Sequence, residues 1–457
     1  MRVDDNAALW HAIQEADEVI PILVLSKDPS YNADTPRRRF VRQAIAELDA
    51  QLRDRGTRLH VRFGDPAGEI PATASAYGAG AVYAVRIYDE PGVRRDGKIH
   101  DLLQQDGKEF HLVKDRVMRE GHEVLTAEGR PYRVFTPFKR RWLALGEDVP
   151  RPFPDAGYMT AVVPASGTVT IDQRGTPAFA SRWNGDEAPG KRLARFLKSS
   201  LAYYDMRRDL PAADGTSKLS HHLALGTLSP RRVYWEAMDL LHSRGPSVRA
   251  AVDMFISELL WREFYYQILT VFPYVLTSSF KEEFRTIEWH RSTSAFERWK
   301  DGMTGYPLVD AGMRQLNEEG WMHNRVRMVV ASFLTKDLHL SWQWGERYFM
   351  DRLVDLDLAA NNGGWQWVAG TGTDAAPWFR IFNPVMQGKK FDPEGAYVRR
   401  YVPELGHVPV RVVHEPWLMS QQDQEAFRCV LGKHYPKKLV EHADQRVLTN
   451  RLYARPA

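Results

Sequence analysis

The feature that most constrains the fold of this 457-residue chain is a change in hydrophobic period near residue 190. Up to about residue 120, stretches with a helical period of about 3.6 residues alternate with four short apolar runs, at residues 19–25, 59–63, 81–85 and 110–113. Such alternation predicts parallel strands joined by helices, as in a Rossmann-like sheet. From Lys191 onward almost every segment follows the helical period. The sequence therefore predicts an α/β domain followed by an all-helical domain.

The limits of these domains follow from the segments between them. Residues 121–190 are rich in proline, glycine and threonine and have weak periodicity, which is typical of a connector. The α/β domain is therefore expected over residues 1–120 and the helical domain over residues 191–457, with polar loops at residues 211–217 and 359–376. No G-x-G-x-x-G motif follows a predicted strand, so a dinucleotide site in the first domain is not expected.

Composition and charge narrow the class of protein. Charged residues make up 26% of the chain and hydrophobic residues 44%, which is ordinary for a globular protein. The net charge of +4 does not by itself indicate a nucleic-acid partner. Cys429 is the only cysteine, so the fold needs no disulfide. No apolar run reaches the roughly twenty residues of a membrane span, and we expect a cytoplasmic monomer that does not bind membranes.

Tryptophan is concentrated in the helical part of the chain. Nine of the fourteen tryptophans lie between residues 261 and 378, which is about a quarter of the sequence. Indole rings more often fill a core than bind a ligand. The enrichment therefore indicates where large aromatic side chains are needed, without assigning a role to any of them.

Two predicted helices combine aromatic and charged residues on one face. In the helix expected at residues 251–268, Glu258, Trp261, Arg262 and Tyr265 stand at positions i, i+3, i+4 and i+7 and share a stripe. An amphipathic helix with a solvated Glu258–Arg262 pair would show the same spacing.

The helix expected at residues 321–335 repeats this pattern with Trp321, Asn324, Arg325 and Met328. Two helices that each carry indole, guanidinium and amide or carboxylate groups predict a pocket for a flat, phosphate-linked ligand. Nucleic acid is a ligand of this kind.

Two polar segments allow more than one interpretation. Thr216, Ser217 and Ser220 lie at an expected loop-to-helix junction, where hydroxyl groups either cap the helix or bind phosphate, and the sequence leaves both open. Asp355 and Asp357 are spaced as in a calcium loop. However, alanine and glutamine occupy positions 359 and 366, where such a loop needs further ligands, so no metal site is expected.

Four segments together resemble the DNA photolyase and cryptochrome family. They are residues 215–232, SELLWREFYY (257–266), TGYPLVDAGMRQLNEEGWMHNRVRM (304–328) and residues 355–384. The resemblance runs from Arg2 to about Leu405 and is closest to the class I photolyases, which repair cyclobutane pyrimidine dimers in DNA. It implies an α/β antenna domain and an all-α FAD-binding domain. The chain starts at Met1 without the apolar strand that opens the family pattern, so the first strand of the antenna sheet is expected to be missing.

The resemblance implies FAD, reduced in the active enzyme, as the cofactor. The residues that match the family's FAD-binding positions are Tyr204, Thr216, Ser217, Lys218, Leu219, Ser220, Phe255, Arg262, Asp355, Leu356, Asp357 and Asn361. Among them, Asn361 is expected to face flavin N5. A second, antenna chromophore of folate or deazaflavin type is also implied, but its identity stays open because residues 88–93 do not reproduce the Asn-Glu pair that binds folate in some relatives.

UV-damaged DNA is the implied partner and a carbon–carbon lyase reaction the implied activity. Excited reduced FAD would pass an electron to the flipped-out dimer, both ring bonds would break, and the electron would return. The implied catalytic residues are Glu258, Asn324, Met328 and Asn361. The residues implied to contact DNA are Glu258, Trp261, Arg262, Tyr265, Asn324, Arg325, Arg380 and Gln387. The residues that match the family's electron-transfer chain are Trp289, Trp342 and Trp365.

A cryptochrome-like photoreceptor without repair activity is the alternative. Asn324 and Met328 match the residues that contact the dimer in the repair enzymes, and Asn361 matches the photolyase choice at its position. The resemblance therefore favours repair over signalling.

Overall fold

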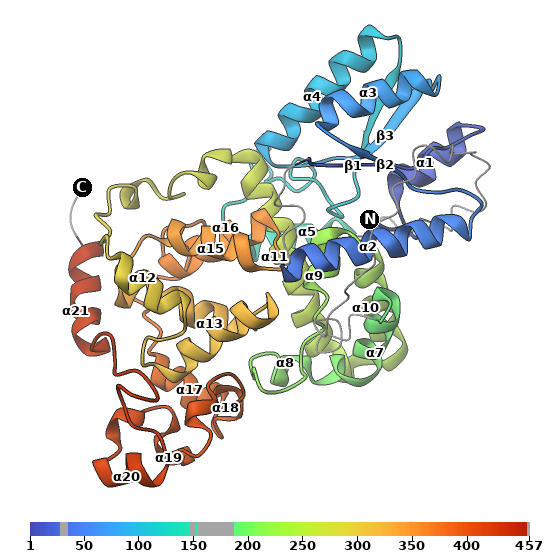
Figure 1. Cartoon of the computed structure of the whole chain (residues 1–457). Helices are drawn as coiled ribbons and strands as arrows, with labels where there is room; N and C mark the ends of the chain where they lie inside the picture. Colours follow the sequence, from blue (N-terminus) through green and yellow to red (C-terminus); the bar gives the residue numbers. More distant parts are fainter. Residues whose placement is uncertain (28–34, 147–151, 154–186, 455–457) are drawn as a thin grey trace. The chain divides into compact units, whose positions relative to one another are not determined.

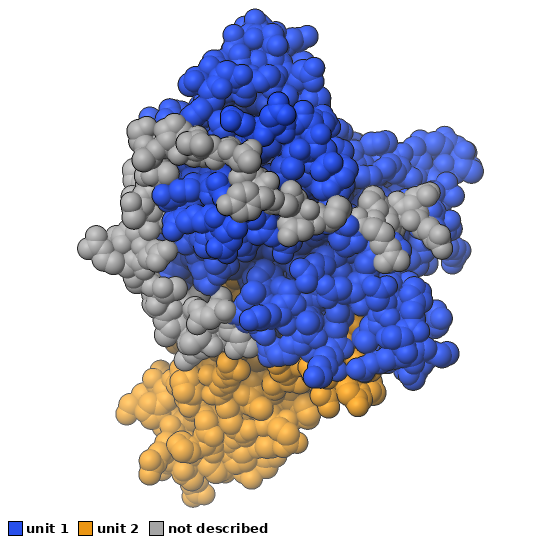
Figure 2. Space-filling model, turned by 90° about the vertical axis from the view of Figure 1, so that its right-hand side faces the viewer, with its two compact units in different colours: residues 1–198, 217–273 blue, residues 199–216, 274–457 orange. Residues whose placement is uncertain are grey.

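The computed structural model describes residues 1–27, 35–146, 152–153 and 187–454 (Figure 1). Contacts within the chain divide it into two compact units, which Figure 2 colours separately. Unit 1 contains residues 1–198 and 217–273, and unit 2 contains residues 199–216 and 274–457. The predicted domain limits at residues 120 and 190 stay predictions, because most of the expected connector lies outside the described residues.

The α/β part of unit 1 contains two pairs of parallel strands. β1 (Ile22–Leu25) pairs with β2 (His60–Phe63), and β3 (Ala81–Val85) pairs with β4 (Glu109–Val113). The four predicted strands and the α/β fold are therefore confirmed. Among the described residues no ladder joins the two pairs, and the residues before α1 (Ala7–Glu15) form no strand. The predicted layer thus consists of two separate parallel pairs.

The helices between the strands begin where the sequence supplies caps. Thr35 caps α2 (Pro36–Arg53), and Asp65 caps α3 (Pro66–Ala76). A cap oxygen accepts a free backbone N–H, and a proline in the first turn loses no hydrogen bond there, so both favour a helix start. With α4 (Glu90–Gln105) these helices form two small cores, whose buried members are Val3, Leu25, Ile45, Leu52, Leu59 and Val61 in one and Ala67, Ala74, Ile99 and Leu103 in the other.

Unit 1 also contains helices that follow the α/β part. They are α5 (Phe135–Ala144), α7 (Pro189–Ser199), α9 (Ser220–Leu225), α10 (Pro230–Arg244) and α11 (Arg249–Val271). Most residues of α11 are buried, so this long helix is a central element of the unit.

A buried charge network joins distant parts of unit 1. Arg231 on α10 lies 2.8 Å from Asp5 and 2.6 Å from Asp115, and Arg2 lies 2.7 Å from Asp115. Burial alone would raise the pKa of Asp115, but the two guanidinium groups outweigh it and lower that pKa. The network therefore ties the first residues of the chain to a strand-end loop and to a helix far along the sequence.

Unit 2 is helical throughout its described part. Its longer helices are α12 (Thr293–Lys300), α13 (Pro307–Glu319), α14 (Asn324–Ser332), α15 (Trp342–Arg352), α16 (Leu358–Ala369), α17 (Pro384–Phe391) and α21 (His442–Tyr453). Shorter ones are α8 (Tyr204–Arg207), α18 (Ala396–Tyr401), α19 (Val410–Val413) and α20 (Gln421–Ala426). One large apolar core joins α12 to α19. Within the described ranges of both units, no helix is long and apolar enough to cross a membrane.

The TGYPLVD segment of unit 2 has a structural explanation. The buried carboxylate of Asp310 accepts hydrogen bonds from the Thr304 backbone N–H (2.7 Å), the Gly305 backbone N–H (3.0 Å) and the Tyr435 hydroxyl (2.6 Å). These bonds close the turn before α13 and attach it to the C-terminal part of the unit. Asp310 thus stabilises the fold.

Two predicted elements of unit 2 are wrong in extent. Residues 359–376 were expected to form a polar loop, but α16 occupies residues 358–369, because Asp357 caps it and its tryptophans and Val368 enter the core. The helix expected at residues 321–335 begins only at Asn324, capped by His323, and passes into a π-helix at residues 333–337. Trp321 therefore lies outside the helix and is not on its stripe.

Candidate functional site

The predicted stripe on α11 of unit 1 is present. Glu258, Trp261, Arg262 and Tyr265 are half-buried on a helix whose intervening residues are mostly buried. The Trp261 ring stacks face to face on Phe135, with 3.8 Å between the ring centroids and 11° between the planes. This contact fixes the orientation of an indole that is only partly covered by unit 1.

The Arg262 side chain has partners that fix its orientation. Its Nη1 donates to the carbonyl oxygen of Arg116 at 2.7 Å, and its guanidinium lies 4.8 Å from the ring centroid of Tyr266. The alternative of a simple solvated Glu258–Arg262 pair does not account for these contacts.

Glu263, which the sequence analysis did not select, is a fully buried carboxyl group beside this stripe. It accepts hydrogen bonds from the backbone N–H groups of Met118 (2.9 Å) and Arg119 (2.9 Å). Burial raises its pKa to about 7, although these bonds and Arg262 lower it. No local sequence signal distinguishes Glu263 from a surface glutamate, because its partners lie about 145 residues earlier.

The predicted phosphate-binding segment is a loop that leads into a helix, as expected. α9 begins at Ser220, and Ser217 precedes it with its carbonyl oxygen accepting from Arg192 Nε at 3.2 Å. Lys218 has a positive φ of 49°, so the chain turns sharply there. Leu219 is buried, and Thr216 is the last residue of this segment that belongs to unit 2.

Two more residues predicted to bind FAD are buried within their own units. In unit 1, Phe255 on α11 lies 5.1 Å from Phe196 between ring centroids. In unit 2, Tyr204 begins α8, and the guanidinium of Arg208 lies 5.5 Å from its ring.

The start of α14 in unit 2 carries Asn324, Arg325 and Met328. Arg325 forms an ion pair with Asp209 at 2.8 Å and lies 4.4 Å from the ring centroid of Phe391. Met328 packs against the apolar core, so it is partly a core residue. The sequence analysis did not select Asp209, since 116 residues separate it from Arg325.

The Asp355–Asp357 segment lies before α16. Asp355 pairs with Arg327 at 2.8 Å, while its Oδ1 is buried without a hydrogen-bond partner among the described residues. Leu356 packs against the core, and Asp357 accepts from the backbone N–H of Ala360 at 3.2 Å. The orphaned oxygen of Asp355 is suited to accept a hydrogen bond from a ligand.

Asn361 on α16 is oriented by α15. Its Nδ2 donates to the carbonyl oxygen of Glu346 at 3.2 Å, which leaves the amide oxygen as the group it offers elsewhere. The neighbouring Asn362 donates to the Glu346 carboxyl group at 2.8 Å. Burial raises the pKa of Glu346 to about 7.

The three tryptophans predicted to transfer electrons share the apolar core of unit 2. Trp342 and Trp365 are 2% and 3% exposed, and Trp289 is partly buried against the same core. The Trp289 ring lies 6.2 Å from Tyr453, and the Trp365 ring lies 6.2 Å from Trp299. Their burial fits both electron transfer and core packing.

The remaining predicted DNA contacts lie near α17. Arg380 is exposed, and Gln387 is half-buried on α17. Phe379 and Met386, which adjoin them in sequence, are 65% and 58% exposed. Arg380 is therefore accessible to a partner, and Gln387 is partly so.

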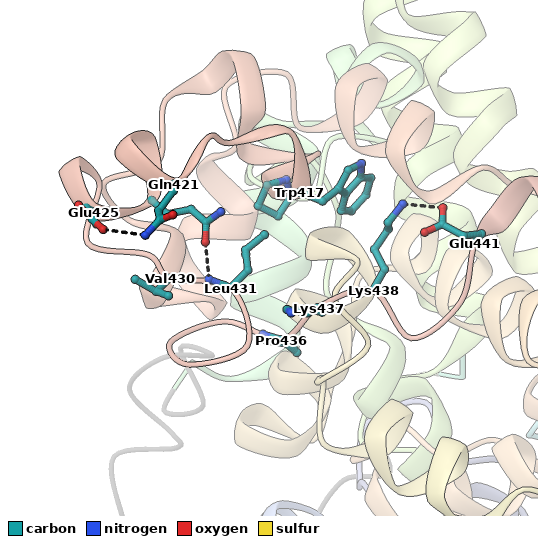
Figure 3. A pocket seen from close by; sticks show the side chains of 11 residues that line it. Trp417, Gln421, Glu425, Val430, Leu431, Pro436, Lys437, Lys438 and Glu441 are labelled. Carbon is teal, nitrogen blue, oxygen red and sulfur yellow. Dashed lines mark hydrogen bonds and ion pairs between the residues drawn. The ribbon is translucent and has the colours of Figure 1, made fainter.

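A pocket of about 550 Å³ lies elsewhere in unit 2 (Figure 3). It is lined by eleven residues of the segment 416–441, among them Trp417, Lys438 and Glu441, and by none of the predicted site residues. Among the described residues, no group of three His, Cys, Asp or Glu could hold a metal ion.

Comparisons with known proteins match both ends of the chain. Residues 1–155 match the family model described as DNA photolyase, and residues 255–455 match the FAD binding domain of DNA photolyase. A deoxyribodipyrimidine photo-lyase of Alkalihalophilus pseudofirmus is 36% identical over 97% of this chain and 94% of its own.

Two solved structures are similar over nearly the whole chain. A class III photolyase from Agrobacterium tumefaciens has a TM-score of 0.90 at 35% identity, covering 99% of this chain and 95% of its own. A photolyase from Sulfolobus tokodaii with two FAD molecules has a TM-score of 0.82 at 31% identity, covering 99% and 97%. The predicted assignment to class I stays a prediction.

Proposed function

Because the chain belongs to the DNA photolyase family, we propose that it is a deoxyribodipyrimidine photo-lyase that uses light to split cyclobutane pyrimidine dimers in DNA. The observation that carries the proposal is the half-buried stripe on α11, where Trp261 is held face to face against Phe135 beside Glu258 and Arg262. A fixed indole next to hydrogen-bonding groups is suited to stack on one base and hold its edge.

FAD is the cofactor of this reaction, and the residues of unit 2 fit it. The buried Oδ1 of Asp355 lacks a partner among the described residues, and the amide oxygen of Asn361 is the free acceptor of that side chain. Both suit the N–H groups of an adenine or flavin ring. Bound FAD supplies the light-driven electron.

The chain's own contribution is binding and orientation. Enzymes that act on a base in duplex DNA extrude it from the stack, as DNA photolyases do. Trp261 would stack on the extruded dimer, and Glu258 would hydrogen-bond it. Asn324 and Met328 would contact the dimer from α14. Tyr265, Arg325, Arg380 and Gln387 would bind the flanking strand and fix its register.

The tryptophans of unit 2 are proposed to return the enzyme to its active state. Trp289, Trp342 and Trp365 would pass electrons inward when the cofactor has become oxidised. The support for this role is that all three match the family's electron-transfer positions; their place in one apolar core fits this role as well as it fits packing.

The test is a repair assay with irradiated oligothymidine and photoreducing blue light. With wild-type protein, the oligothymidine is expected to lose its dimers only in the light. Glu258→Ala and Trp261→Ala are expected to lower repair at limiting DNA by at least tenfold. Trp417→Ala, which removes a half-buried indole outside the proposed site, is the matched control and should repair normally. Absence of light-dependent repair by protein that holds reduced FAD would refute the function and favour the photoreceptor alternative.

A second chromophore, the oligomeric state and the cellular location are further parts of the proposal. We propose a cytoplasmic monomer with an antenna pigment of folate, deazaflavin or flavin type. Light scattering after gel filtration should give a mass near 52.5 kDa. Absorption spectra and chromatography of the pigments released on denaturation should identify any chromophore besides one FAD.

A further inference from the structure

The guanidinium of Arg325 is already engaged in unit 2. Its Nη2 lies 2.8 Å from Asp209 Oδ2, and its Cζ lies 4.4 Å from the ring centroid of Phe391. Asp209 follows α8 and Phe391 ends α17, so two different elements hold the side chain. Its Nε is buried and has no hydrogen-bond partner among the described residues.

The carboxylate is the more accessible member of this pair. The Asp209 side chain is 34% exposed and that of Arg325 is 18% exposed. Arg208 is a second cation near Asp209, with Nε 3.9 Å from Oδ1. Asp209 therefore neutralises positive charge at a place where solvent reaches the carboxylate.

A carboxylate and a phosphate offer a guanidinium the same kind of acceptor. Both present oxygens in one plane that match the forked N–H donors of arginine. A phosphate oxygen that approaches Arg325 must therefore compete with Asp209 for its donors. It is also repelled by the carboxylate, because the two groups carry charge of the same sign.

We propose that Asp209 is an internal competitor that occupies Arg325 until a DNA phosphate displaces it. The proposal rests on the proposed function, since it takes Arg325 as a DNA contact. Because a phosphate must first displace the Asp209 carboxylate, the affinity of the protein for every duplex is lower than it would be without Asp209. A duplex that contains a dimer still binds through Trp261 and Glu258, whereas an undamaged duplex relies on its backbone alone. Asp209 thus keeps the enzyme from occupying undamaged DNA.

The test is dark binding of full-length holoenzyme to labelled undamaged and dimer-containing duplexes, measured by fluorescence anisotropy over a range of salt. Asp209→Asn is expected to tighten binding to undamaged duplex by about three- to tenfold. The slope of log affinity against log salt should steepen by up to about 0.9, because in the wild type the displaced Asp209 carboxylate takes up a cation that offsets the one released from the phosphate. Asp205→Asn is the matched control, because it removes the same charge from an exposed residue of α8.

Each outcome decides the proposal. If Asp209→Asn binds DNA more weakly, as Arg325→Ala is expected to, then Asp209 holds Arg325 in position for DNA. This result would overturn the proposal. Equal tightening by Asp205→Asn, or tightening by Asp209→Asn that persists in an Arg325→Ala background, would overturn it as well. Unchanged binding by Arg325→Ala alone would show that Arg325 is not a DNA contact, while light-driven repair would still report on the proposed function. Asp209→Ser replaces Asp209→Asn if the latter fails to fold.

Discussion

At the scale of single residues, side chains gain their properties from partners far away in the sequence. Glu263 would be a buried carboxyl group without its main hydrogen-bond donors if the backbone N–H groups of residues 118 and 119 were not beside it. Trp261 owes its fixed ring to Phe135, and Arg325 owes its neutralised charge to Asp209. The residue type determines which interactions a side chain can form, and partners far away in the sequence determine which of these it forms in the folded protein.

The raised pKa of Glu263 makes the stability of unit 1 depend on pH. Its pKa rises from 4.5 to about 7 on folding, so the folded state holds a proton more tightly than the unfolded state. The stabilisation that protonated Glu263 gives the folded state is fully present below pH 4.5 and is lost as the pH rises to about 7. The free energy of unfolding changes by up to about 3 kcal/mol over this range. The free energy of unfolding, measured with denaturant at several pH values, should fall over this range. Glu263→Gln should lower stability by about 1–3 kcal/mol and flatten the pH dependence; an unchanged slope would contradict the assignment.

Trp365→Phe should separate photoreduction from repair. Removal of the indole is expected to slow photoreduction of oxidised FAD by at least tenfold, because phenylalanine is much harder to oxidise. Repair by enzyme that was reduced chemically should remain near the wild-type rate. Trp367→Phe, two residues further along and packed on the same core, is the control. Equal loss of both activities in Trp365→Phe would mean that the indole serves packing instead.

At the scale of elements, the sequence predicted those whose signals are local. The four strands are confirmed, because alternating apolar residues act within a few positions. The start of α2 depends on signals just as local, a cap and a proline. α16 was missed, because residues 361–364 have low helix propensity, while burial of Trp365 and Val368, together with the Asp357 cap, stabilises the helix. In the site, Glu263, Arg327 and Asp209 were missed, since their partners lie 28 to about 145 residues away.

The contact between α15 and α16 depends on a glycine. A Cβ at Gly345 would lie 2.1 Å from Cη2 of Trp365, well inside van der Waals contact. Gly345→Ala should therefore push the two helices apart or turn the indole, lower stability by about 1–3 kcal/mol and slow photoreduction. Gly97→Ala, at an open helical position of α4, should be neutral or raise stability by about 0.4–1 kcal/mol. Thermal unfolding of both variants would test this; an unchanged melting temperature for Gly345→Ala would count against the packing described.

At the scale of the whole molecule, unit 1 is held together by interactions that span its sequence. Arg231 reaches Asp5 and Asp115, which lie 226 and 116 residues away. Its removal would take from the buried Asp5 the guanidinium that pairs with it and would leave Asp115 with Arg2. This makes the network a condition for cooperative folding of the unit.

Arg231→Met is expected to lower the stability of unit 1 by about 3–5 kcal/mol. Because the pKa of Asp115 is lower folded than unfolded, the stability it supplies is present above its usual pKa of 3.8 and is lost as the pH falls through the folded value. Wild-type protein should therefore lose stability in acid more steeply than Arg231→Met. Arg232→Met, which removes a half-exposed pair with Glu236, should cost at most about 1 kcal/mol. Similar losses for both variants, measured by denaturant unfolding, would show that the buried network contributes little.

The division of the chain also has a consequence for its biosynthesis. Unit 1 is interrupted by residues 199–216, which belong to unit 2, and it is completed only at residue 273. The chain is synthesised from its N-terminus, so α7 leaves the ribosome before α10 and α11 have been made. Unit 1 is complete only when these two helices are present. Residues 199–216 must wait longer still, until residues 274–457 follow. Newly made chains should thus depend on chaperones late in translation, when most of the protein has already left the ribosome.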